Sequence, residues 1–253
     1  MPRIYMLCST ENVFHPPVFD SILRKHSGQI VGAAIFPPLK TETLPSKIKK
    51  CFMFDGWRAL PRLFSHWVTH QKNCRFYSPP HFFKVEDVFN HYRITVDHFN
   101  NPNSEKCIER VRSLQVDIIF NNQPRILKEG ILAAPRICGL NKHTSKLPAY
   151  RGIEPVFHAL LDGCGTIGVS IHSMTPEIDA GEVFAQAVVP ASKSVFDCYT
   201  RTFRLVPELF TKALDNLVKG TPLCSVDAEG TPYYREPGRE EIARFRKMGL
   251  WYL

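Results

Sequence analysis

The sequence contains no apolar run of about 18 residues, so nothing in it predicts a membrane-spanning helix. Its 8 cysteines are scattered singly, without the paired spacing of metal-binding motifs or disulfide frameworks, and we expect no metal site. The apolar residues at the start are too few for a secretory signal and predict a first buried strand. Together these absences favour a reducing compartment, and we expect a cytoplasmic location.

Glycine is absent before Gly28. A nucleotide-binding βα unit usually carries a glycine-rich turn after its first strand, where backbone amides hold a phosphate. Here the residues that follow the apolar run Ile4–Leu7 form a turn without glycine. Three polar residues of this turn, Ser9, Thr10 and Asn12, are candidates for substrate contact, although roles as turn and cap residues explain them more simply.

The composition is that of an ordinary globular protein. Of its 253 residues, 44% are hydrophobic and 22% charged, enough to bury one sizeable core. We expect one large domain over residues 1–220 and a short tail over residues 221–253. The formal net charge of +8 favours anionic partners, without choosing among nucleic acid, a phosphorylated sugar and lipid.

Apolar runs and helical periodicities alternate along the chain, which indicates an α/β sheet. Ser194 is expected to begin a long helix that Pro207 breaks or kinks before Gly220. In the tail, residues 224–226 and 231–234 flank a turn and predict a hairpin, followed by a helix over residues 238–247. The other expected elements are strands at Ile4–Leu7, Gln29–Ile35 and Val116–Phe120, helices at Pro17–Lys25, from Ser104 to Leu114 and at Gly152–Leu161, and consecutive antiparallel strands at Gly168–Ser173 and Glu182–Val189.

Acidic residues are almost absent from residues 44–76, where seven Lys or Arg residues accompany the single acid Asp55. Aromatic residues stand among these cations at helical spacing, and Pro61 is expected to divide two helices. Such an insertion could lie on a membrane surface, clamp a diphosphate, or bind tRNA through its phosphates. Alternatively, it packs on the core and leaves a basic face in solvent.

Asn141 and His143 stand two residues apart at the end of the apolar run Ile137–Leu140. If that run is a strand, its period of two places both side chains on one face. An amide that can donate to an oxyanion then lies beside an imidazole that can move a proton. Asp179 follows a second apolar run and could return to the same edge to orient the imidazole. The three suit acyl transfer, whereas each alone is a common structural residue.

Asn141-x-His143-x-Ser145-x-Leu147-Pro148-x-x-Arg151-Gly152, followed by Asp179-x-Gly181, resembles the signature of the folate-dependent formyltransferases. That family includes glycinamide ribonucleotide transformylase, methionyl-tRNA formyltransferase and the sugar N-formyltransferases. Gln123-Pro124-Arg125-Ile126-Leu127 is similar to the start of the family's pterin pocket. Motif order and spacing agree from about Val116 to Pro190, whereas residues 1–115 are similar only in architecture.

The resemblance implies a Rossmann-like formyltransferase core, with a mostly parallel sheet flanked by helices, and 10-formyltetrahydrofolate as the formyl donor. It implies Asn141, His143 and Asp179 as the catalytic residues. Arg151 could contact an anionic substrate or form a structural ion pair. The residues implied to bind the pterin are Arg125, Ile126, Leu127, Pro176, Glu177 and Ile178.

The expected activity is N-formyl transfer to the primary amine of a small molecule, and the expected molecule is a nucleotide-linked amino sugar. A hydrolase of the same donor and a non-catalytic folate-binding protein are the alternatives. The turn without glycine disfavours glycinamide ribonucleotide transformylase, and residues 221–253 are too few for the C-terminal barrel of methionyl-tRNA formyltransferase. We expect no nucleic-acid partner. The tail or residues 44–76 could form a homodimer surface, and residues 44–76 could also contact a membrane peripherally.

Overall fold

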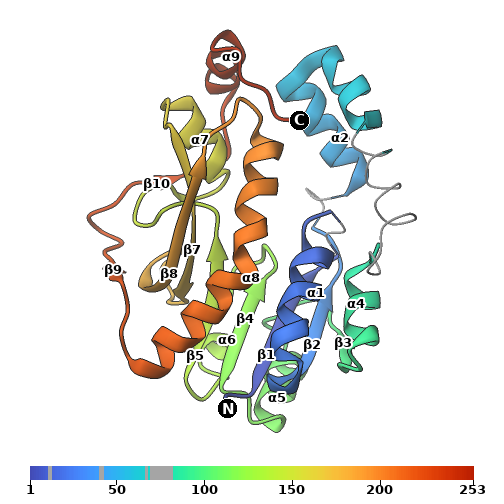
Figure 1. The fold of residues 1–253 in the computed structure, drawn as a ribbon, viewed down its shortest axis with the longest axis vertical. Coiled ribbons are helices and arrows are strands. Elements are labelled where there is room, and N and C mark those ends of the chain that lie inside the picture. Colours follow the sequence, from blue (N-terminus) through green and yellow to red (C-terminus); the bar gives the residue numbers. More distant parts are fainter. Residues whose placement is uncertain (11–12, 40–42, 66–67, 69–81) are drawn as a thin grey trace.

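The computed structural model describes residues 1–10, 13–39, 43–65, 68 and 82–253, which form an α/β fold (Figure 1). Its strands are β1 (Ile4–Ser9), β2 (Ile30–Phe36), β3 (Val96–His98), β4 (Ile118–Asn122), β5 (Cys138–His143), β6 (Arg151–Gly152), β7 (Thr166–Ser173), β8 (Gly181–Pro190), β9 (Cys224–Val226) and β10 (Tyr233–Tyr234). Its α-helices are α1 (His15–His26), α2 (Leu44–Asp55), α4 (Val85–His91), α5 (Glu105–Ser113), α6 (Glu129–Leu132), α7 (Pro155–Leu161), α8 (Val195–Lys219) and α9 (Arg239–Lys247). The 3₁₀ turns η1 (Ser27–Gln29) and η3 (Gly56–Arg58) complete the set of named elements.

Eight of these strands form one sheet in the order β3-β2-β1-β4-β5-β7-β8-β9. The five strands from β3 to β5 run parallel, and β7, β8 and β9 continue the sheet in antiparallel pairing. The mostly parallel α/β sheet expected from the sequence is therefore confirmed. In the parallel part, the carboxyl ends of β1, β4 and β5 meet at one edge, which is where open α/β sheets bind ligands.

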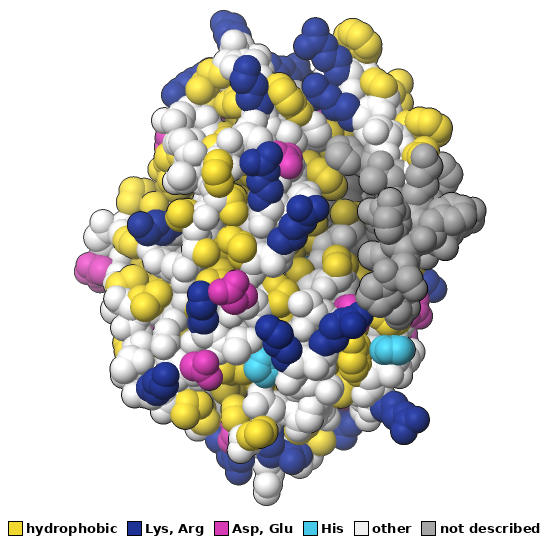
Figure 2. Space-filling model, in the orientation of Figure 1, with side chains coloured by type: hydrophobic (Ala, Val, Ile, Leu, Met, Phe, Trp, Pro, Cys, Tyr) yellow, Lys and Arg dark blue, Asp and Glu magenta, His cyan; other side chains and the backbone are white. Residues whose placement is uncertain are grey.

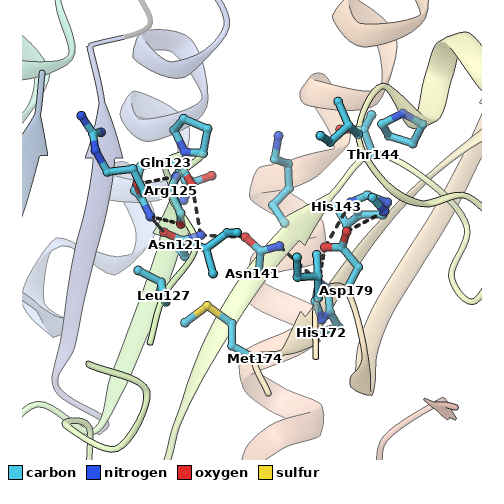
Figure 3. Close-up of a pocket in the computed structure, with 18 of the residues that line it drawn as sticks. Asn121, Gln123, Arg125, Leu127, Asn141, His143, Thr144, His172, Met174 and Asp179 are labelled. Carbon is cyan, nitrogen blue, oxygen red and sulfur yellow. Dashed lines mark hydrogen bonds and ion pairs between the residues drawn. The ribbon is translucent and has the colours of Figure 1, made fainter. Parts of the chain in front are cut away.

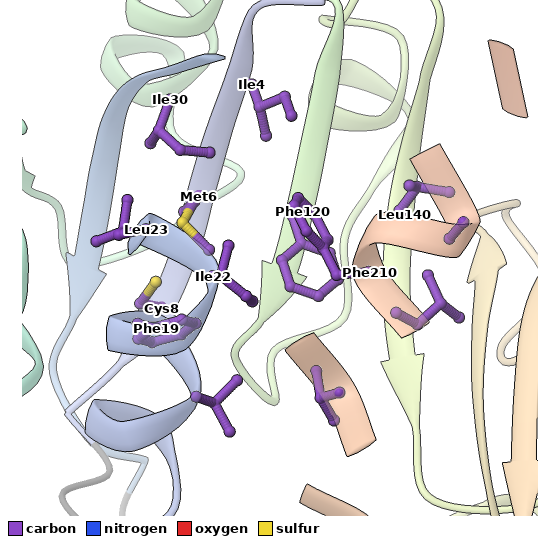
Figure 4. Close-up of a cluster of buried hydrophobic side chains, with 14 of the residues drawn as sticks. Ile4, Met6, Cys8, Phe19, Ile22, Leu23, Ile30, Phe120, Leu140 and Phe210 are labelled. Atoms are coloured by element: carbon purple, nitrogen blue, oxygen red, sulfur yellow. The ribbon is translucent and has the colours of Figure 1, made fainter. Parts of the chain in front are cut away.

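Helices cover both faces of the sheet (Figure 1). On one face, α1, α4 and α8 bury the largest apolar cluster against the strands. Figure 4 shows this cluster, in which the rings of Phe120 from β4 and Phe210 from α8 lie 4.6 Å apart between centroids. On the other face, α5 and α6 bury Val111 and Ile131 against alternate residues of the same strands. Burial on both sides explains why these strands are continuous apolar runs in the sequence.

Two expectations for the C-terminal half need correction. The helix α8 is continuous across Pro207, so this residue does not break it. Residues 224–226 and 233–234 do not form a hairpin, because β9 pairs with β8 and β10 pairs in parallel with β6. Without β9, strand β8 would leave the backbone N–H and C=O groups of one edge unpaired, and β9 forms hydrogen bonds with them. A separate two-stranded hairpin in the tail would be only marginally stable. The helix expected after the hairpin is present as α9.

The expected division of residues 44–76 at Pro61 is also wrong. The chain turns at Gly56, whose φ of 60° lies in the left-handed region that favours glycine. Residues 59–65 are helical again, with Pro61 near their amino-terminal end, where its missing N–H is tolerated. Residues 66–67 and 69–76 of the predicted insertion lie outside the described residues. Within the described part of the chain, no helix is both long and apolar enough to span a membrane.

Candidate active site

A cavity of about 580 Å³ lies at the carboxyl edge of the parallel strands. Residues at the ends of β1, β4 and β5 line it, among them Ser9, Asn121 and Asn141. Figure 3 shows Asn141 between two groups of side chains, with Gln123, Arg125 and Leu127 on one side and His143 and Asp179 on the other. The volume is that of a typical small-molecule site.

The structure brings His143 and Asp179 together. Nδ1 of His143 lies 3.4 Å from Oδ1 of Asp179, and both side chains are buried. Nε2 of His143 lies 2.8 Å from the carbonyl oxygen of Tyr150, which can only accept, so this nitrogen carries a hydrogen. Nδ1 is then the nitrogen that can take up and release a proton beside the carboxylate. The other oxygen of Asp179 accepts from the Gly152 N–H at 2.9 Å, which fixes the carboxylate.

A second buried histidine, His172 of β7, lies next to both Asn141 and His143. Its Nδ1 lies 2.9 Å and 3.1 Å from the carbonyl oxygens of Ser173 and Ala180, so Nδ1 carries the hydrogen. Nε2 therefore accepts from Nδ2 of Asn141 at 3.2 Å. Burial lowers the pKa of His172, which favours this neutral form.

On its other side, Asn141 joins a network of amides. Nδ2 of Asn121 donates to the backbone carbonyl of Gln123 at 3.2 Å and to Oδ1 of Asn141 at 3.0 Å. The side chain of Gln123 donates to Oδ1 of Asn121 at 3.0 Å and to the carbonyl of Arg125 at 2.9 Å. Its own oxygen accepts from the Arg125 N–H at 2.8 Å. Backbone carbonyls can only accept and backbone N–H groups can only donate. These partners therefore determine which end of each side-chain amide is the oxygen and which is the nitrogen.

The consequence for Asn141 is a single orientation of its amide. Its oxygen accepts from Asn121, and its nitrogen points toward His172. One of the two hydrogens on Nδ2 serves His172, and the other has no partner among the described residues. Since Asn141 lines the cavity, this hydrogen is a donor for a negatively charged oxygen held there.

All six residues expected to bind a pterin line the cavity: Arg125, Ile126, Leu127, Pro176, Glu177 and Ile178. Nη1 of Arg125 is buried without a hydrogen-bond partner, whereas Nη2 donates to the carbonyl of Pro37 at 2.6 Å. Gln123 already occupies the backbone N–H and C=O of Arg125. Among the described residues, the backbone groups of Leu127 have no hydrogen-bond partner. Nη1 of Arg125 and the backbone of Leu127 therefore provide hydrogen-bond donors and an acceptor for a polar heterocycle on this side of the cavity.

The cavity extends to the α8 side of the sheet. Lys142 follows Asn141 on β5 and so faces the opposite side, where its Nζ lies 3.8 Å from the ring centroid of Phe203. His15 and Tyr199 line the cavity on the same side. Burial raises the pKa of Tyr199, so its hydroxyl keeps its hydrogen. This part of the cavity combines one cation with aromatic side chains.

The remaining predicted contacts are distributed differently. Ser9 lines the cavity, whereas Thr10 is exposed and does not, and Asn12 lies outside the described residues. Arg151 is buried and also does not line the cavity. Its guanidinium donates to the carbonyls of Ile178, Ala228 and Thr231 and to the Thr231 hydroxyl, at 2.7–3.3 Å. In place of the expected substrate contact or ion pair, the structure shows Arg151 joining the Asp179 loop to the tail.

Sequence reasoning missed His172 and Asn121, and it named Gln123 only as part of the motif that resembles a pterin pocket. A signal existed for the two amides, because they directly follow the predicted strand Val116–Phe120 at the edge where ligands bind. His172 lies within a predicted strand, and nothing local separates it from a structural histidine. Among the described residues, no group of three or more His, Cys, Asp or Glu side chains could hold a metal ion.

A mostly parallel sheet with Asn141, His143 and Asp179 at its carboxyl edge defines an enzyme-like α/β site for group transfer. Residues 68–214, more than half of the chain, match the family described as formyl transferase, and the chain belongs to that family. It is 34% identical over 135 residues to methionyl-tRNA formyltransferase of Enterococcus faecalis, covering 52% of this chain and 42% of that protein. It is 37% identical over 163 residues to the bifunctional polymyxin resistance protein ArnA of Wigglesworthia glossinidia brevipalpis, covering 61% and 24%. The chain thus spans less than half the length of these two relatives.

Solved structures share the fold. Glycinamide ribonucleotide transformylase 1 of Symbiobacterium toebii superposes with a TM-score of 0.59 at 19% identity, covering 90% of this chain and 95% of that one. An N-formyltransferase of Helicobacter canadensis, solved with folinic acid and dTDP-3-aminofucose, superposes with a TM-score of 0.57 at 16% identity, covering 96% and 79%. At these identities the likeness concerns the fold alone.

Proposed function

We propose that the protein is an N-formyltransferase that moves the formyl group of 10-formyltetrahydrofolate to the primary amine of a small molecule. The observation that carries this proposal is the fixed amide of Asn141 in the cavity wall, with one hydrogen left for a ligand, beside the contact between His143 and Asp179. Membership of the formyl transferase family supports it. The seven cysteines that the structure describes carry free thiols, which supports a cytoplasmic enzyme.

The reaction forms a bond between the amine nitrogen and the formyl carbon and breaks the bond between that carbon and the donor nitrogen. Asn141 donates its remaining hydrogen to the formyl oxygen as this oxygen gains negative charge. His143 takes the proton that the attacking amine loses, at Nδ1, and returns it to the departing nitrogen. Asp179 stabilises the positive charge that His143 carries between these two transfers.

The residues of the cavity fit the proposed donor. A reduced pterin presents a flat ring with hydrogen-bond donors and acceptors along one edge. The backbone of Leu127 and the orphaned Nη1 of Arg125 can pair with such an edge. When bound, the donor supplies the activated formyl group, and all other chemistry comes from the chain. Pro176, Glu177 and Ile178 would form the opposing wall.

For the acceptor we propose an amino sugar carried on a nucleotide. The α8 side of the cavity offers the cation of Lys142 and the ring of Tyr199, which suit an anionic group and a flat or apolar surface respectively. The Helicobacter canadensis enzyme, which has the same fold, was solved with a nucleotide-linked amino sugar. Methionyl-tRNA is the second acceptor to test, because a relative with that name shares 34% identity over 135 residues.

The test is release of tetrahydrofolate from 10-formyltetrahydrofolate by the purified chain, with product mass read in parallel. The acceptors are a panel of nucleotide-linked amino sugars, methionyl-tRNA, and no amine. We expect turnover to need an amine and to add one formyl group to it. Asn141→Ala should lower the rate about 100- to 1,000-fold, and His143→Ala about 100- to 10,000-fold. His98→Ala, at an exposed histidine outside the site, is the matched control and should keep full activity.

Each other outcome contradicts the proposal in a different way. Turnover without any amine would make the protein a hydrolase of the same donor. Tight folate binding without turnover on any acceptor would make it a folate-binding protein. Full activity of a folded His143→Ala variant would remove the proton-transfer role given to that residue, whichever acceptor is used.

A further inference from the structure

Six large hydrophobic side chains lie exposed between residues 48 and 64, and we call them the outer face. Trp57 is 75% exposed, Phe64 67% and Leu60 59%. In Figure 2, hydrophobic side chains gather together with Lys and Arg at the corner that α2 occupies in Figure 1. The outer face consists of Ile48, Phe52, Met53, Trp57, Leu60 and Phe64.

This face is not the side by which α2 packs on the protein. The inward side is formed by other residues, Cys51, Phe54 and Ala59, which are 0–5% exposed. Phe54 packs edge-on against Phe157 of α7, with ring centroids 5.3 Å apart. The segment therefore has two apolar sides, and core packing explains only the inner one. A second apolar side of this size indicates an interaction surface.

The segment is also firmly attached, so the outer face is presented by a fixed scaffold. Arg246 of α9 donates to the carbonyls of Phe52, Met53 and Phe54 at the end of α2. Asp55 accepts from the backbone N–H groups of residues 252 and 253 at 2.7 Å and 3.0 Å. Substitutions on the outer face leave these contacts intact.

Within residues 44–65, the exposed charges have one sign. Lys49 and Arg58 are exposed, and the Arg58 guanidinium lies 5.9 Å from the ring centroid of Trp57. The only acid of residues 44–65 is Asp55, whose side chain is fully buried and paired with Arg62 at 3.3 Å. A symmetric contact with a second copy would place these cations against each other, which costs energy. A surface of negative charge with an apolar interior suits this face best.

We propose that the outer face binds the surface of a lipid bilayer that contains anionic lipids. Trp57, Leu60 and Phe64 would enter the boundary between headgroups and acyl chains, and Lys49 and Arg58 would contact the phosphates. The proposal does not depend on formyl transfer, because it concerns a surface apart from the residues that line the cavity.

Binding through the outer face would also fix where the cavity lies relative to the membrane. Lys50 of α2 forms ion pairs with Glu154 and with Glu236, the latter at 3.1 Å. Ile153 and Pro155, on either side of Glu154, line the cavity. The docked protein therefore holds this wall of the cavity beside the segment that contacts the membrane.

The test is flotation of the full chain with vesicles of phosphatidylcholine alone and of phosphatidylcholine with roughly a third of phosphatidylglycerol, which gives the vesicle a negative surface potential. We expect the protein to float with the anionic vesicles and far less with the neutral ones. Added salt should release it, because the phosphate contacts are screened. Trp57 fluorescence should shift to the blue and be quenched by doxyl-labelled lipid, and Trp57→Phe should remove most of that response.

The variants separate the apolar and charged contributions. Trp57→Ser with Phe64→Ser should lower the partition coefficient by a factor of ten or more, since each ring loses its apolar burial. Lys49→Gln with Arg58→Gln should lower it about fivefold per charge. Val218→Ser with Ile137→Ser removes two exposed hydrophobic side chains elsewhere and should leave binding unchanged. Thermal unfolding of each variant checks that it is folded.

Three results would overturn the proposal. The first is wild-type protein that does not float with anionic vesicles. The second is equal flotation of wild type and the folded Trp57→Ser, Phe64→Ser variant. The third is a wild-type dimer in light scattering that this variant converts to monomer without any vesicle binding, which would assign the outer face to a second copy of the chain.

Discussion

The amide of Asn141 has one orientation because its neighbours are themselves oriented by backbone groups. Asn121 is fixed by the carbonyl of Gln123, and His172 by the carbonyls of Ser173 and Ala180. Without these neighbours, an asparagine could turn either its oxygen or its nitrogen to the cavity at little cost. Only the nitrogen can stabilise a developing negative charge, so the surrounding network decides whether Asn141 can act.

Asn121→Leu should lower kcat about tenfold, because the oxygen of Asn141 loses its donor and the amide can rotate, a change comparable to one hydrogen bond. The KM values should change little, since the walls of the cavity remain. Steady-state kinetics with 10-formyltetrahydrofolate and the acceptor that the turnover test identifies measure both constants. Asn90→Leu, at an exposed position of α4, is the control. A rise in KM at unchanged kcat would show that Asn121 only shapes the cavity.

The buried His172 should make stability depend on pH. Burial lowers its pKa in the folded state, with Asp179 opposing and His143 reinforcing this effect. In the unfolded chain this histidine keeps a pKa of about 6.5, so below that pH the unfolded chain binds a proton that the folded chain does not. The free energy of unfolding should therefore fall as the pH drops below about 6.5, by up to about 1.4 kcal/mol per pH unit.

Urea unfolding between pH 7.5 and 5 measures this dependence. His172→Gln supplies the matched variant, because its side-chain oxygen can still accept from Asn141 but does not titrate. The variant should lose less stability than the wild type over this range. Equal slopes for the two proteins would show that His172 is not the group responsible.

Among the residues of the candidate site, the sequence predicted the relative positions of those that lie close together in the chain. Asn141 and His143 follow one apolar run two residues apart, and the period of a strand places them on one face. The structure places Asp179 beside them. The contact between Asn121 and Asn141 depends on the register of β4 against β5, which aligns these two positions. No local pattern fixes that register, so the amide network could not be predicted.

The pair of short strands β6 and β10 joins the Asp179 loop to the tail. The guanidinium of Arg151 in β6 donates to both, and among the described residues its partners are carbonyls and a hydroxyl and not a carboxylate. Gly152 has a φ of 101°, and a side chain there would meet the carbonyl of Tyr234 at 2.2 Å. Glycine is therefore required for β6 to approach β10 this closely.

Arg151→Met should lower the free energy of unfolding by about 3 kcal/mol, since the carbonyls of Ile178, Ala228 and Thr231 each lose a hydrogen bond worth about 1 kcal/mol. It should also lower kcat, because the carbonyl of Ile178, one residue before Asp179, loses its donors. Thermal unfolding and steady-state kinetics measure the two effects, with the exposed Arg235→Met as the control. A destabilised variant with unchanged kcat would separate Arg151 from the position of Asp179.

At the scale of elements, the apolar runs located most strands, whereas the pairing of the tail was predicted wrongly. The strands β1, β2 and β4 are long and buried on both faces, so their composition alone marks them. β9 and β10 have three and two residues, and their partners lie far away in the sequence. A turn-like segment between two short runs predicts a hairpin, and only tertiary contacts show otherwise.

For the whole molecule, the tail is part of the same core as residues 1–220. Phe245 of α9 is fully buried, stacks on Phe157 at 4.5 Å and lies 6.3 Å from Phe54. This cluster holds α2, α7 and α9 together. The division into a domain and a tail remains a prediction about sequence organisation, but the buried contacts make separate unfolding of the tail unfavourable.

Phe245→Ala should lower the free energy of unfolding by about 3–5 kcal/mol and keep a single cooperative transition, because the cavity it leaves is shared by three helices. Urea unfolding followed by both circular dichroism and Trp fluorescence measures this. Met248→Ala, 43% exposed, is the control. Two separate transitions would show that the tail unfolds independently.

The hydrogen bond between the Gly152 N–H and Asp179 has a consequence for exchange with solvent. The next amide, Ile153 N–H, donates at 3.0 Å to Tyr234 of the tail. A ligand that holds Asp179 in place therefore also holds β6 against β10, and by linkage the tail and the ligand stabilise each other. Filling the cavity should slow deuterium uptake at both amides, although the second donates to the tail and not to Asp179. The tail thus reports occupancy of the site.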